Sequence, residues 1–256
     1  IVDDEVNSRV YDIFKKEGSD AWYKRDISDF LGQKYKAENY IKVDDIVEVW
    51  FDSGSTHSYV LENRKDLDWP ADMYLEGSDQ HRGWFHSSLL HSSGTRGQAP
   101  YKSILTHGFV VDGKGQKMSK SLGNVIAPEE IIKKNGADIL RLWVVASDYS
   151  EDLRIDQSII RQHSESYRKI RNTLRFLLGN ISDEFSFKEF NNFDFDKLDF
   201  IDSFIINKIS ELDNNFSYYE KNNEFHKIYV ELLNFCTIDL SSLYFDISKD
   251  CLYCED

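Results

Sequence analysis

The apolar positions in the first half of the chain alternate between helical spacing and short runs. Helical spacing near the start predicts a helix, with irregular structure after it to about residue 40: Val6, Val10, Ile13 and Phe14. Short apolar runs at 46–51, 73–76 and 104–111 predict strands, and the stretch from about 80 to 93 predicts a helix. A strand, a helix and a further strand within about forty residues are typical of a parallel crossover unit. The first part of the chain is therefore predicted to be an α/β fold with a parallel, nucleotide-binding sheet.

The pattern changes past residue 147, where the strand signals stop. Apolar residues then recur near the helical period in three segments: 159–181, about 200–216 and 225–248. The segment 184–200 is rich in Phe, Asn and Asp, which predicts a loop fixed by its aromatic side chains. We therefore predict two domains, an α/β domain at 1–149 and an all-α helical bundle at 150–256.

Length and composition allow a packed core and exclude several classes of protein. The chain has 256 residues, of which 41% are apolar, so it is able to form one large or two medium domains. It has no apolar run of about eighteen residues, and its first residues are no signal peptide, so no membrane association is predicted. It begins without Met and in the middle of a pattern, which we interpret as a fragment.

The three cysteines are Cys236, Cys251 and Cys254. An odd number in a chain of this length indicates reduced thiols and a cytoplasmic protein. Cys251 and Cys254 have the spacing of half a zinc site. No second pair of Cys or His follows them, so no protein-bound metal is predicted.

The formal net charge of −14 disfavours nucleic-acid binding, but one segment departs from it. Between 158 and 181 the basic residues outnumber the single acid, Glu165. Four arginines there are candidates for contact with RNA: Arg161, Arg168, Arg171 and Arg175. A solvated face on which the same arginines pair with neighbouring acids fits the pattern equally well.

A basic loop, Lys-Met-Ser-Lys-Ser at 117–121, lies between a predicted strand and a predicted helix. The strand ends in the turn residues Asp-Gly-Lys-Gly at 112–115, and the helix is expected to begin at Pro128. Two ammonium groups three positions apart, with Ser119 and Ser121 as hydroxyl donors, are able to bind one polyphosphate. The loop is no Walker loop, since G-x-x-x-x-G-K-[ST] does not occur. By itself, such a pentapeptide is more typical of a solvated turn.

Further segments accompany the basic loop in a fixed order. They are Val49-Trp-Phe-Asp-Ser-Gly-Ser-Thr-His57, Tyr74-Leu-Glu-Gly-Ser-Asp-Gln-His-Arg-Gly-Trp-Phe85, Leu105-Thr-His-Gly-Phe109 and Gly136-Ala-Asp-Ile-Leu-Arg-Leu-Trp143. On these segments the chain resembles class I aminoacyl-tRNA synthetases, and among them the isoleucine-specific ones. A weaker resemblance at 167–178 and 241–251 extends it to nearly the whole chain. It implies the second half of a Rossmann-type catalytic domain at 1–149 and part of an α-helical anticodon-binding domain at 150–256.

The resemblance implies ATP-dependent activation of L-isoleucine to isoleucyl-adenylate and transfer to tRNA(Ile), with Mg²⁺ on the ATP phosphates. It implies that Lys117 and Lys120 are catalytic, because their charges stabilise the leaving pyrophosphate. Contact with ATP or the adenylate is implied for a larger set: Glu76, Asp79, Gln80, His107, Gly108, Phe109, Met118, Ser119 and Lys120. The four arginines would contact tRNA.

Trp50 and Trp84 are implied to be the walls of an apolar slot for the isoleucine side chain. Without the resemblance, both are interpreted as core aromatic residues, Glu76 as a solvated strand end and His107 as a core histidine. Gly108 permits a close approach to the backbone, which suits an adenine ring at the strand end.

The family's first signature, His-Ile-Gly-His, occurs at none of the seven histidines. The chain alone is therefore expected to activate little or no isoleucine, and it contains no editing domain. Smaller departures are Glu48, where relatives commonly have Asp, and Ala127, where Ser would cap the helix better. The parent enzyme is expected to be a cytoplasmic monomer. Three alternatives stay open: a valine or leucine synthetase, a non-catalytic tRNA-binding module, and an unrelated nucleotide-binding protein.

Overall fold

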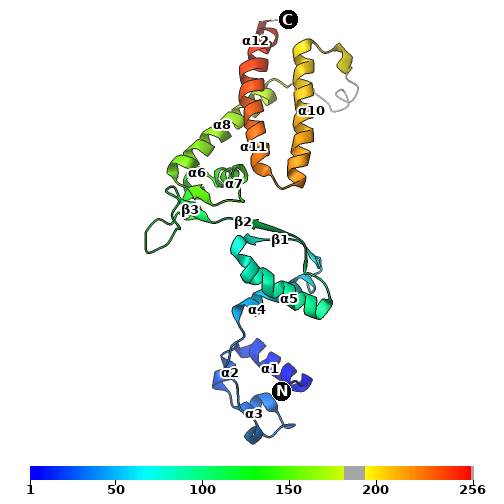
Figure 1. Cartoon of the computed structure of the whole chain (residues 1–256), viewed down its shortest axis with the longest axis vertical. Helices are drawn as coiled ribbons and strands as arrows, with labels where there is room; N and C mark the ends of the chain where they lie inside the picture. Colours follow the sequence, from blue (N-terminus) through cyan, green and yellow to red (C-terminus); the bar gives the residue numbers. More distant parts are fainter. Residues whose placement is uncertain (182–193, 255–256) are drawn as a thin grey trace.

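A computed structural model describes residues 1–181 and 194–254 and divides along its long axis into three parts (Figure 1). Short N-terminal helices form one end, and long helices form the other. Two small parallel sheets and their helices lie between them. The fold is therefore α/β in its first part and all-α in its second, as the sequence predicts.

The N-terminal part is a group of short helices around aromatic side chains. Its elements are α1 (Asp4–Glu17), α2 (Ala21–Lys24), α3 (Ile27–Leu31) and a 3₁₀ turn (Ala37–Asn39). α1 begins where the Asp3 side chain accepts hydrogen bonds from two backbone N–H groups of the first turn. The rings of Phe14, Trp22 and Phe30 pack together with centroids 5.0 to 6.5 Å apart. The predicted first helix is confirmed.

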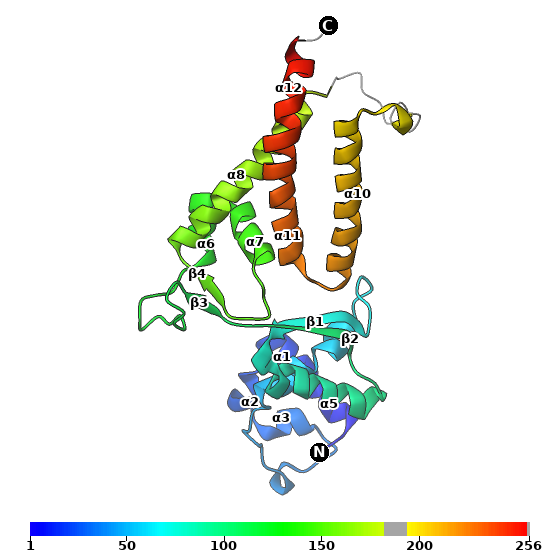
Figure 2. The same cartoon turned by 45° about the horizontal axis from the view of Figure 1, so that its top comes forward.

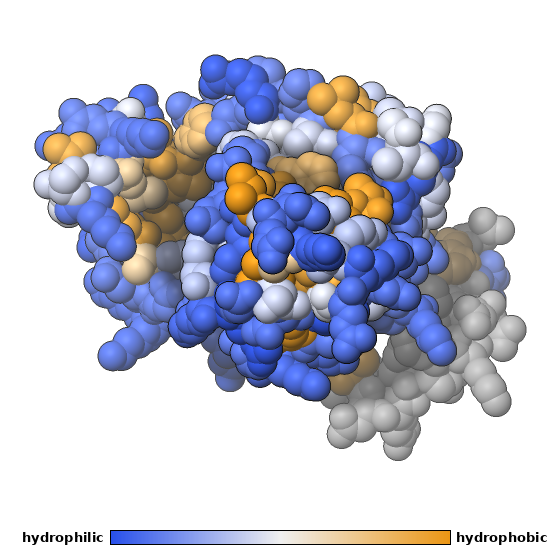
Figure 3. All heavy atoms as spheres, turned by 90° about the horizontal axis from the view of Figure 1, so that it is seen from below, coloured by the Kyte–Doolittle hydropathy of each residue, from blue (hydrophilic) through white to orange (hydrophobic). Residues whose placement is uncertain are grey.

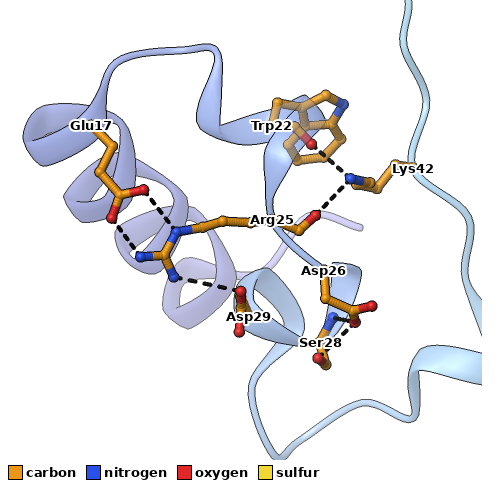
Figure 4. A network of polar contacts seen from close by, with 7 residues as sticks. All are labelled: Glu17, Trp22, Arg25, Asp26, Ser28, Asp29 and Lys42. Atoms are coloured by element: carbon orange, nitrogen blue, oxygen red, sulfur yellow. Dashed lines mark hydrogen bonds and ion pairs between the residues drawn. The ribbon is translucent and has the colours of Figure 1, made fainter.

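A network of polar contacts connects these helices (Figure 4). The Arg25 guanidinium forms an ion pair with Glu17 at the end of α1 and lies 3.5 Å from a carboxylate oxygen of Asp29 on α3. The Lys42 ammonium donates hydrogen bonds to the backbone oxygens of Trp22 and Arg25, at 2.7 and 2.8 Å. Arg25 therefore joins three helices, and Lys42 fixes the irregular segment that follows them.

The predicted strand at 46–51 is wrong. Residues 41–48 are irregular. Two helical elements follow them, α4 (Val49–Gly54) and a π-helical turn (His57–Leu61). A short apolar run is compatible with a helix and with a strand, so the outcome depends on what the run packs against.

α4 packs against α5 (Trp84–Arg96), and this contact favours the helix. The Glu48 side chain caps α4 by accepting a hydrogen bond from the backbone N–H of Trp50 at 2.7 Å. Gly54 permits the close approach of the two helices, because a Cβ atom there would lie 2.7 Å from Ser87 Oγ.

The first sheet is the predicted crossover unit, which is confirmed. Its elements are β1 (Ala71–Gly77), a 3₁₀ turn (Ser78–Arg82), α5 and β2 (Tyr101–His107). The two strands are parallel, and Gly77 lies beside His107 at their carboxyl ends. α5 covers one face, where Tyr74 is buried and its hydroxyl lies 3.1 Å from Ser88 Oγ. Because the 3₁₀ turn comes first, α5 begins later than the predicted position 80.

The predicted strand at 104–111 is broken at Gly108 and Phe109. Its last residues belong to a second sheet of two parallel strands, β3 (Val110–Asp112) and β4 (Leu153–Ile155). The apolar pattern does not predict β4. At the break, Gly108 N donates to Tyr149 O at 2.9 Å, and Phe109 N donates to Asp152 Oδ1 at 2.8 Å. These bonds to a later segment interrupt the ladder, so the two sheets are separate.

α6 (Pro128–Asn135) and α7 (Ala137–Ala146) connect the strands of the second sheet, and the predicted helix at Pro128 is confirmed. Their apolar faces meet β4 and the first turn of α8 (Gln157–Gly179) in a buried cluster: Ile131, Ile139, Trp143, Ile155 and Ile160. The start of α8 is therefore anchored on the second sheet and its helices.

The second part of the chain is a helical bundle, as predicted. After α8 come α10 (Phe200–Lys221), α11 (Phe225–Asn234), a π-helical stretch (Phe235–Tyr244) and α12 (Phe245–Cys254). The last three run on as one rod (Figure 2), which agrees with the predicted helix at 225–248. A second buried cluster joins this rod to α10: Ile205, Phe235, Leu240 and Phe245. The predicted loop at 184–200 falls mostly outside the described residues, and its described end holds a 3₁₀ turn (Phe195–Lys197).

The surface bears on the membrane question. In the described ranges, 1–181 and 194–254, no helix has both the length and the apolar character to span a membrane. Seen from below, the surface is mostly hydrophilic with separate apolar spots (Figure 3). Met73 and Leu75 of β1 are exposed on the face of the first sheet opposite Tyr74 and α5.

Candidate functional site

A cavity of about 550 Å³ lies at the carboxyl end of β1, between α4 and the start of α5. It is lined by Trp50, Asp52, Ser53, Thr56, Tyr59, Glu76, Gln80 and Trp84. The cavity brings together four of the residues singled out from the sequence: Trp50, Glu76, Gln80 and Trp84. Its position beyond a strand end is where open parallel sheets bind ligands.

The two tryptophans of the cavity are held in different ways. The Trp84 indole stacks on Tyr74, with centroids 4.5 Å apart and an interplanar angle of 12°. Trp50 is 42% exposed, so it is not a core residue. Its ring lies against the start of α5, because a Cβ atom on Gly83 would be 3.2 Å from it. Ser87 Oγ lies 2.7 Å from Trp50 O and thereby ties α4 to α5 beneath the cavity.

The polar side of the cavity is formed by Glu76 and Gln80. Glu76 is exposed, and its carboxylate accepts a hydrogen bond from the neighbouring backbone N–H of Gly77 at 3.1 Å. Within the described part of the chain, Glu76 forms no ion pair. Gln80 Oε1 accepts from Trp84 N at 3.0 Å and so caps α5. The Glu76 carboxylate is therefore available to a ligand cation.

Four further lining residues, on α4 and in the segment after it, were not predicted from the sequence: Asp52, Ser53, Thr56 and Tyr59. Their helical spacing was the available signal, but the strand predicted at 46–51 concealed it. The Thr56 hydroxyl lies 3.0 Å from the Tyr59 hydroxyl and donates to Ser53 O at 2.8 Å. These groups add polar atoms to the lining of the cavity.

The other residues predicted to contact nucleotide lie around the ends of β1 and β2. Asp79 is exposed and close to Gly77, since a Cβ atom there would lie 2.9 Å from its carboxylate. The same atom would be 3.8 Å from the Phe109 ring. His107 is half-buried, with Nδ1 2.7 Å from Gly108 O. These residues therefore border the strand ends beside the cavity, although they do not line it.

Gly108 is closely approached by the chain itself. A Cβ atom at this position would lie 2.3 Å from Glu151 O and 2.8 Å from Asp152 N. Any side chain would displace this backbone. The need for glycine here therefore follows from packing within the protein, not only from the space that an adenine ring would require.

A pair of histidines connects the π-helical turn (His57–Leu61) with α5. His57 is fully buried, and its Nε2 is 3.0 Å from Nδ1 of His91 on α5. Burial lowers the pKa of His57, and the nearby charges of Arg96 and His91 lower it further, against a smaller opposing effect of Glu62. The pair therefore joins the π-helical turn after α4 to α5, with His57 neutral near pH 7.

The lysine loop at 117–121 lies apart from the cavity lining. Lys117 and Lys120 are exposed, and among the described residues neither forms an ion pair. Met118 between them packs against the cluster around Trp143. Ser119 is half-buried, and its hydroxyl lies 3.1 Å from that of Ser121. The loop thus presents two unpaired ammonium groups from an anchored backbone.

The four arginines of α8 are all exposed, and their spacing places them on one side of the helix: Arg161, Arg168, Arg171 and Arg175. In the part of the chain that the structure describes, none of them forms an ion pair. Arg168 and Arg171 also line a cavity of about 390 Å³ at the start of α7. The structure therefore does not show the pairing with neighbouring acids that was the alternative interpretation.

Residues with metal-binding side chains do not cluster in the described ranges, where no group of three or more His, Cys, Asp or Glu is placed to hold a metal ion. The three cysteines form no disulfide. Cys236 is buried, which raises the pKa of its thiol.

Comparison with known proteins gives consistent results. Residues 1–156 match the family model of "tRNA synthetases class I (I, L, M and V)". The chain is 64% identical to the isoleucine–tRNA ligase of Pelagibacter ubique and 54% identical to that of Campylobacter hominis, in each case over 100% of this chain and 28% of the relative. The ligase of Brucella abortus (strain 2308) is 50% identical over 99% of this chain and 26% of its own length. The chain thus spans little more than a quarter of these relatives.

Solved structures share the fold at low sequence identity. The ternary complex LeuRS-tRNA-LeuAMS of Agrobacterium radiobacter K84 matches with a TM-score of 0.59 and 15% identity, over 82% of this chain and 32% of that one. Methionyl-tRNA synthetase of Mycobacterium tuberculosis, in complex with methionyl-adenylate, matches with a TM-score of 0.55 and 17% identity, over 80% and 40%. Because the family model covers more than half of the chain, the chain belongs to the class I tRNA synthetases of the isoleucine, leucine, methionine and valine group.

Proposed function

We propose that the chain is part of an isoleucine–tRNA ligase, which activates L-isoleucine with ATP to isoleucyl-adenylate and transfers the acyl group to tRNA(Ile). The observation that carries the proposal is the cavity in which Trp50 and Trp84 meet Glu76 and Gln80. The names of the relatives that match the whole chain support the same amino acid.

The cavity combines the two kinds of group that an aliphatic amino acid needs. The indoles of Trp50 and Trp84 offer apolar surface to a branched side chain. The unpaired carboxylate of Glu76 is suited to accept hydrogen bonds from an ammonium group or a ribose hydroxyl. Asp79, His107 and Phe109 border the strand ends, where the nucleotide part of the adenylate would lie.

Adenylate formation requires charge stabilisation more than covalent help from the protein. An oxygen of the isoleucine carboxylate forms a bond to the α-phosphorus of ATP, and the bond from that phosphorus to the bridging oxygen breaks. Pyrophosphate leaves with the additional negative charge. The exposed, unpaired ammonium groups of Lys117 and Lys120 are suited to stabilise this charge, with Met118 and Ser119 holding the backbone between them. Mg²⁺ would be bound by the phosphates rather than by protein side chains.

The two parts of the chain have different roles in this proposal. Residues 1–149 would form the second half of the catalytic domain, and residues 150–256 would begin the anticodon-binding domain. The unpaired arginines of α8 would contact tRNA phosphates. We further propose that the parent enzyme acts as a monomer in the cytoplasm.

The test of the amino-acid substrate uses a chimera in which this chain replaces the matching segment of the Pelagibacter ubique relative. We expect the chimera to exchange pyrophosphate into ATP when isoleucine is present. Valine should be used less efficiently by about 10- to 200-fold, the range for one methylene in an apolar pocket, for which this enzyme class is a standard example. A folded chimera that prefers valine or leucine, or that shows no exchange, would contradict the proposal.

The tRNA contact leads to a separate prediction. Replacing both Arg168 and Arg171 by Ala should weaken tRNA binding by the chimera, because two unpaired charges on α8 are lost. The slope of log affinity against log salt should become shallower by about one for each phosphate contact removed. Fluorescence anisotropy over about 50 to 200 mM salt measures this slope. Arg64→Ala, which removes a surface cation already paired with Asp66, is the control. An unchanged slope in the double variant would exclude the arginines from the interface.

A further inference from the structure

The base of the lysine loop is organised by one carboxylate. Asp112 Oδ1, at the end of β3, accepts hydrogen bonds from the backbone N–H groups of Lys114 and Gln116 at 3.0 and 2.8 Å. The backbone of Asp112 also accepts from Gly115 N at 2.8 Å and donates to Gln116 O at 2.9 Å. Gly115 has a φ of 80°, which glycine adopts readily. The turn before the two lysines is therefore fixed to the sheet.

The end of the same loop is fixed by a single side chain, that of Asn124. Its Nδ2 donates to Asp112 Oδ2 at 2.9 Å and lies 3.3 Å from Lys117 O. Its Oδ1 accepts from Ser119 N at 2.9 Å. The partners determine the orientation of the amide, because a carboxylate and a carbonyl only accept and a backbone N–H only donates.

These contacts restrain the backbone without engaging the ammonium groups. The bonds of Asn124 reach the main chain of Lys117 and of Ser119, on both sides of Met118, which packs on the buried cluster. The side chains of Lys117 and Lys120 stay exposed. One amide thus ties the shape of the lysine segment to β3.

The charge state of Asp112 favours its contact with Asn124. The Asn124 amide, followed by the backbone N–H groups of Gln116 and Lys114, holds the pKa of the Asp112 carboxyl below its usual range. Asp112 is therefore ionised near pH 7 and remains an acceptor for Asn124.

We infer that Asn124 is a positioning residue for adenylate formation, which holds the backbone of the lysine loop against Asp112 so that Lys117 and Lys120 meet the polyphosphate in one preferred arrangement. The inference rests on the proposed function for the role of the lysines. The contact itself is independent of that function. A pre-ordered loop loses less conformational freedom when it binds phosphate, so its charges act with less entropic cost.

The first test measures the loop directly in the chimera. Trypsin cleaves after Lys114, Lys117 and Lys120, and cleavage requires the loop to open locally. We expect Asn124→Ala to be cut at these sites roughly 10- to 100-fold faster, as mass spectrometry of the products would show, because three hydrogen bonds are lost. Asn214→Ala, which alters an exposed asparagine of α10, should leave the rate unchanged. Cleavage of Asn124→Ala at the rate of the unaltered chimera would overturn the inference.

The second test measures catalysis in the chimera. Asn124→Ala should lower kcat for isoleucine-dependent pyrophosphate exchange roughly 10- to 100-fold and leave KM for isoleucine unchanged. A merely destabilised protein would not show this separation. A normal kcat, or an equal effect on kcat and KM, would overturn the positioning role. A chimera without any exchange would count against the proposed function, and the trypsin rates would still decide whether Asn124 holds the loop.

Exchanging the residues at positions 112 and 124 distinguishes the loss of this contact from a general loss of packing. Asn124→Asp alone places two carboxylates at hydrogen-bonding distance and should reduce both the protection of the loop against trypsin and kcat. Combining it with Asp112→Asn restores one donor and one acceptor at the contact and should recover most of both losses. If the double variant behaves no better than Asn124→Asp, the contact with Asp112 is not what orders the loop.

Discussion

Replacing Lys120 by Ala should lower kcat for isoleucine-dependent pyrophosphate exchange in the chimera by about 100- to 1,000-fold, the usual loss for one preorganised charge-stabilising group. The KM for isoleucine should not change, because the loop does not line the cavity proposed to bind the amino acid. Stability should be unaffected, since the Lys120 side chain is exposed and has no ion pair in the described part of the chain. Steady-state kinetics of exchange, with a thermal unfolding curve of each variant, measure these quantities.

Lys114→Ala is the matched control for this prediction. Lys114 is an exposed lysine of the same loop, and its backbone N–H, which the substitution keeps, donates the hydrogen bond to Asp112. Its removal should therefore leave kcat close to that of the unaltered chimera. Losses of similar size in both variants would indicate an effect of net charge. A parallel fall of kcat and isoleucine affinity in Lys120→Ala would rule out a role specific to the transition state.

Replacing Glu76 by Ala should weaken binding of a non-hydrolysable isoleucyl-adenylate analogue by about 10- to 100-fold, since a hydrogen bond to a charged group contributes about 1.5 to 3 kcal/mol. The fold should not suffer, because the carboxylate is exposed and, among the described residues, bonds only to the adjacent backbone N–H of Gly77. Isothermal titration calorimetry of the chimera with the analogue and its valyl counterpart gives both affinity and preference.

Two comparisons make the Glu76 result specific. Glu76→Gln keeps the shape of the side chain and removes its charge, so it should show most of the loss if an ammonium group is bound. Glu130→Ala, which alters an exposed carboxylate in the first turn of α6, should bind normally. Unchanged affinity in Glu76→Ala would remove this residue from the site.

The helices with a long amphipathic pattern could be predicted from the sequence, whereas elements that depend on distant contacts could not. α1 and α8 follow from apolar spacing, and the structure adds the side chains of Asp3 and Asp156, which cap their first turns. The strand predicted at 46–51 was wrong because a segment of six residues, the length of α4, has too little periodicity to distinguish a helix from a strand. The packing of α4 on α5 decides its conformation. β4 could not be predicted, because these three residues form a strand only by pairing with β3, about forty positions earlier.

Some residues of the candidate site could likewise be predicted from the sequence, and others could not. Glu76 could be placed at a strand end of a parallel crossover unit, where open sheets bind ligands, but its contact with the adenylate was implied only by the resemblance. The proximity of Trp50 to Trp84 followed only from the resemblance to known synthetases. Thr56 and Tyr59 could not be predicted as lining residues, because their positions in the cavity depend on α4 being helical. Asn124 was also missed, since nothing in the local pattern indicates that its amide reaches back twelve positions to Asp112.

The break between β2 and β3 has a mechanical consequence. The cavity belongs to the first sheet and the lysine loop to the second, and Gly108 and Phe109 separate β2 from β3. A torsion at this point would alter the distance between the ammonium groups and the cavity while both ladders remain intact. The resistance to such a rotation comes from the bonds of Gly108 and Phe109 to Tyr149, Asp152 and Leu153 and from the tight contact at Gly108. The break is thus a stiff joint, and its stiffness is set by the segment that leads into the helical bundle.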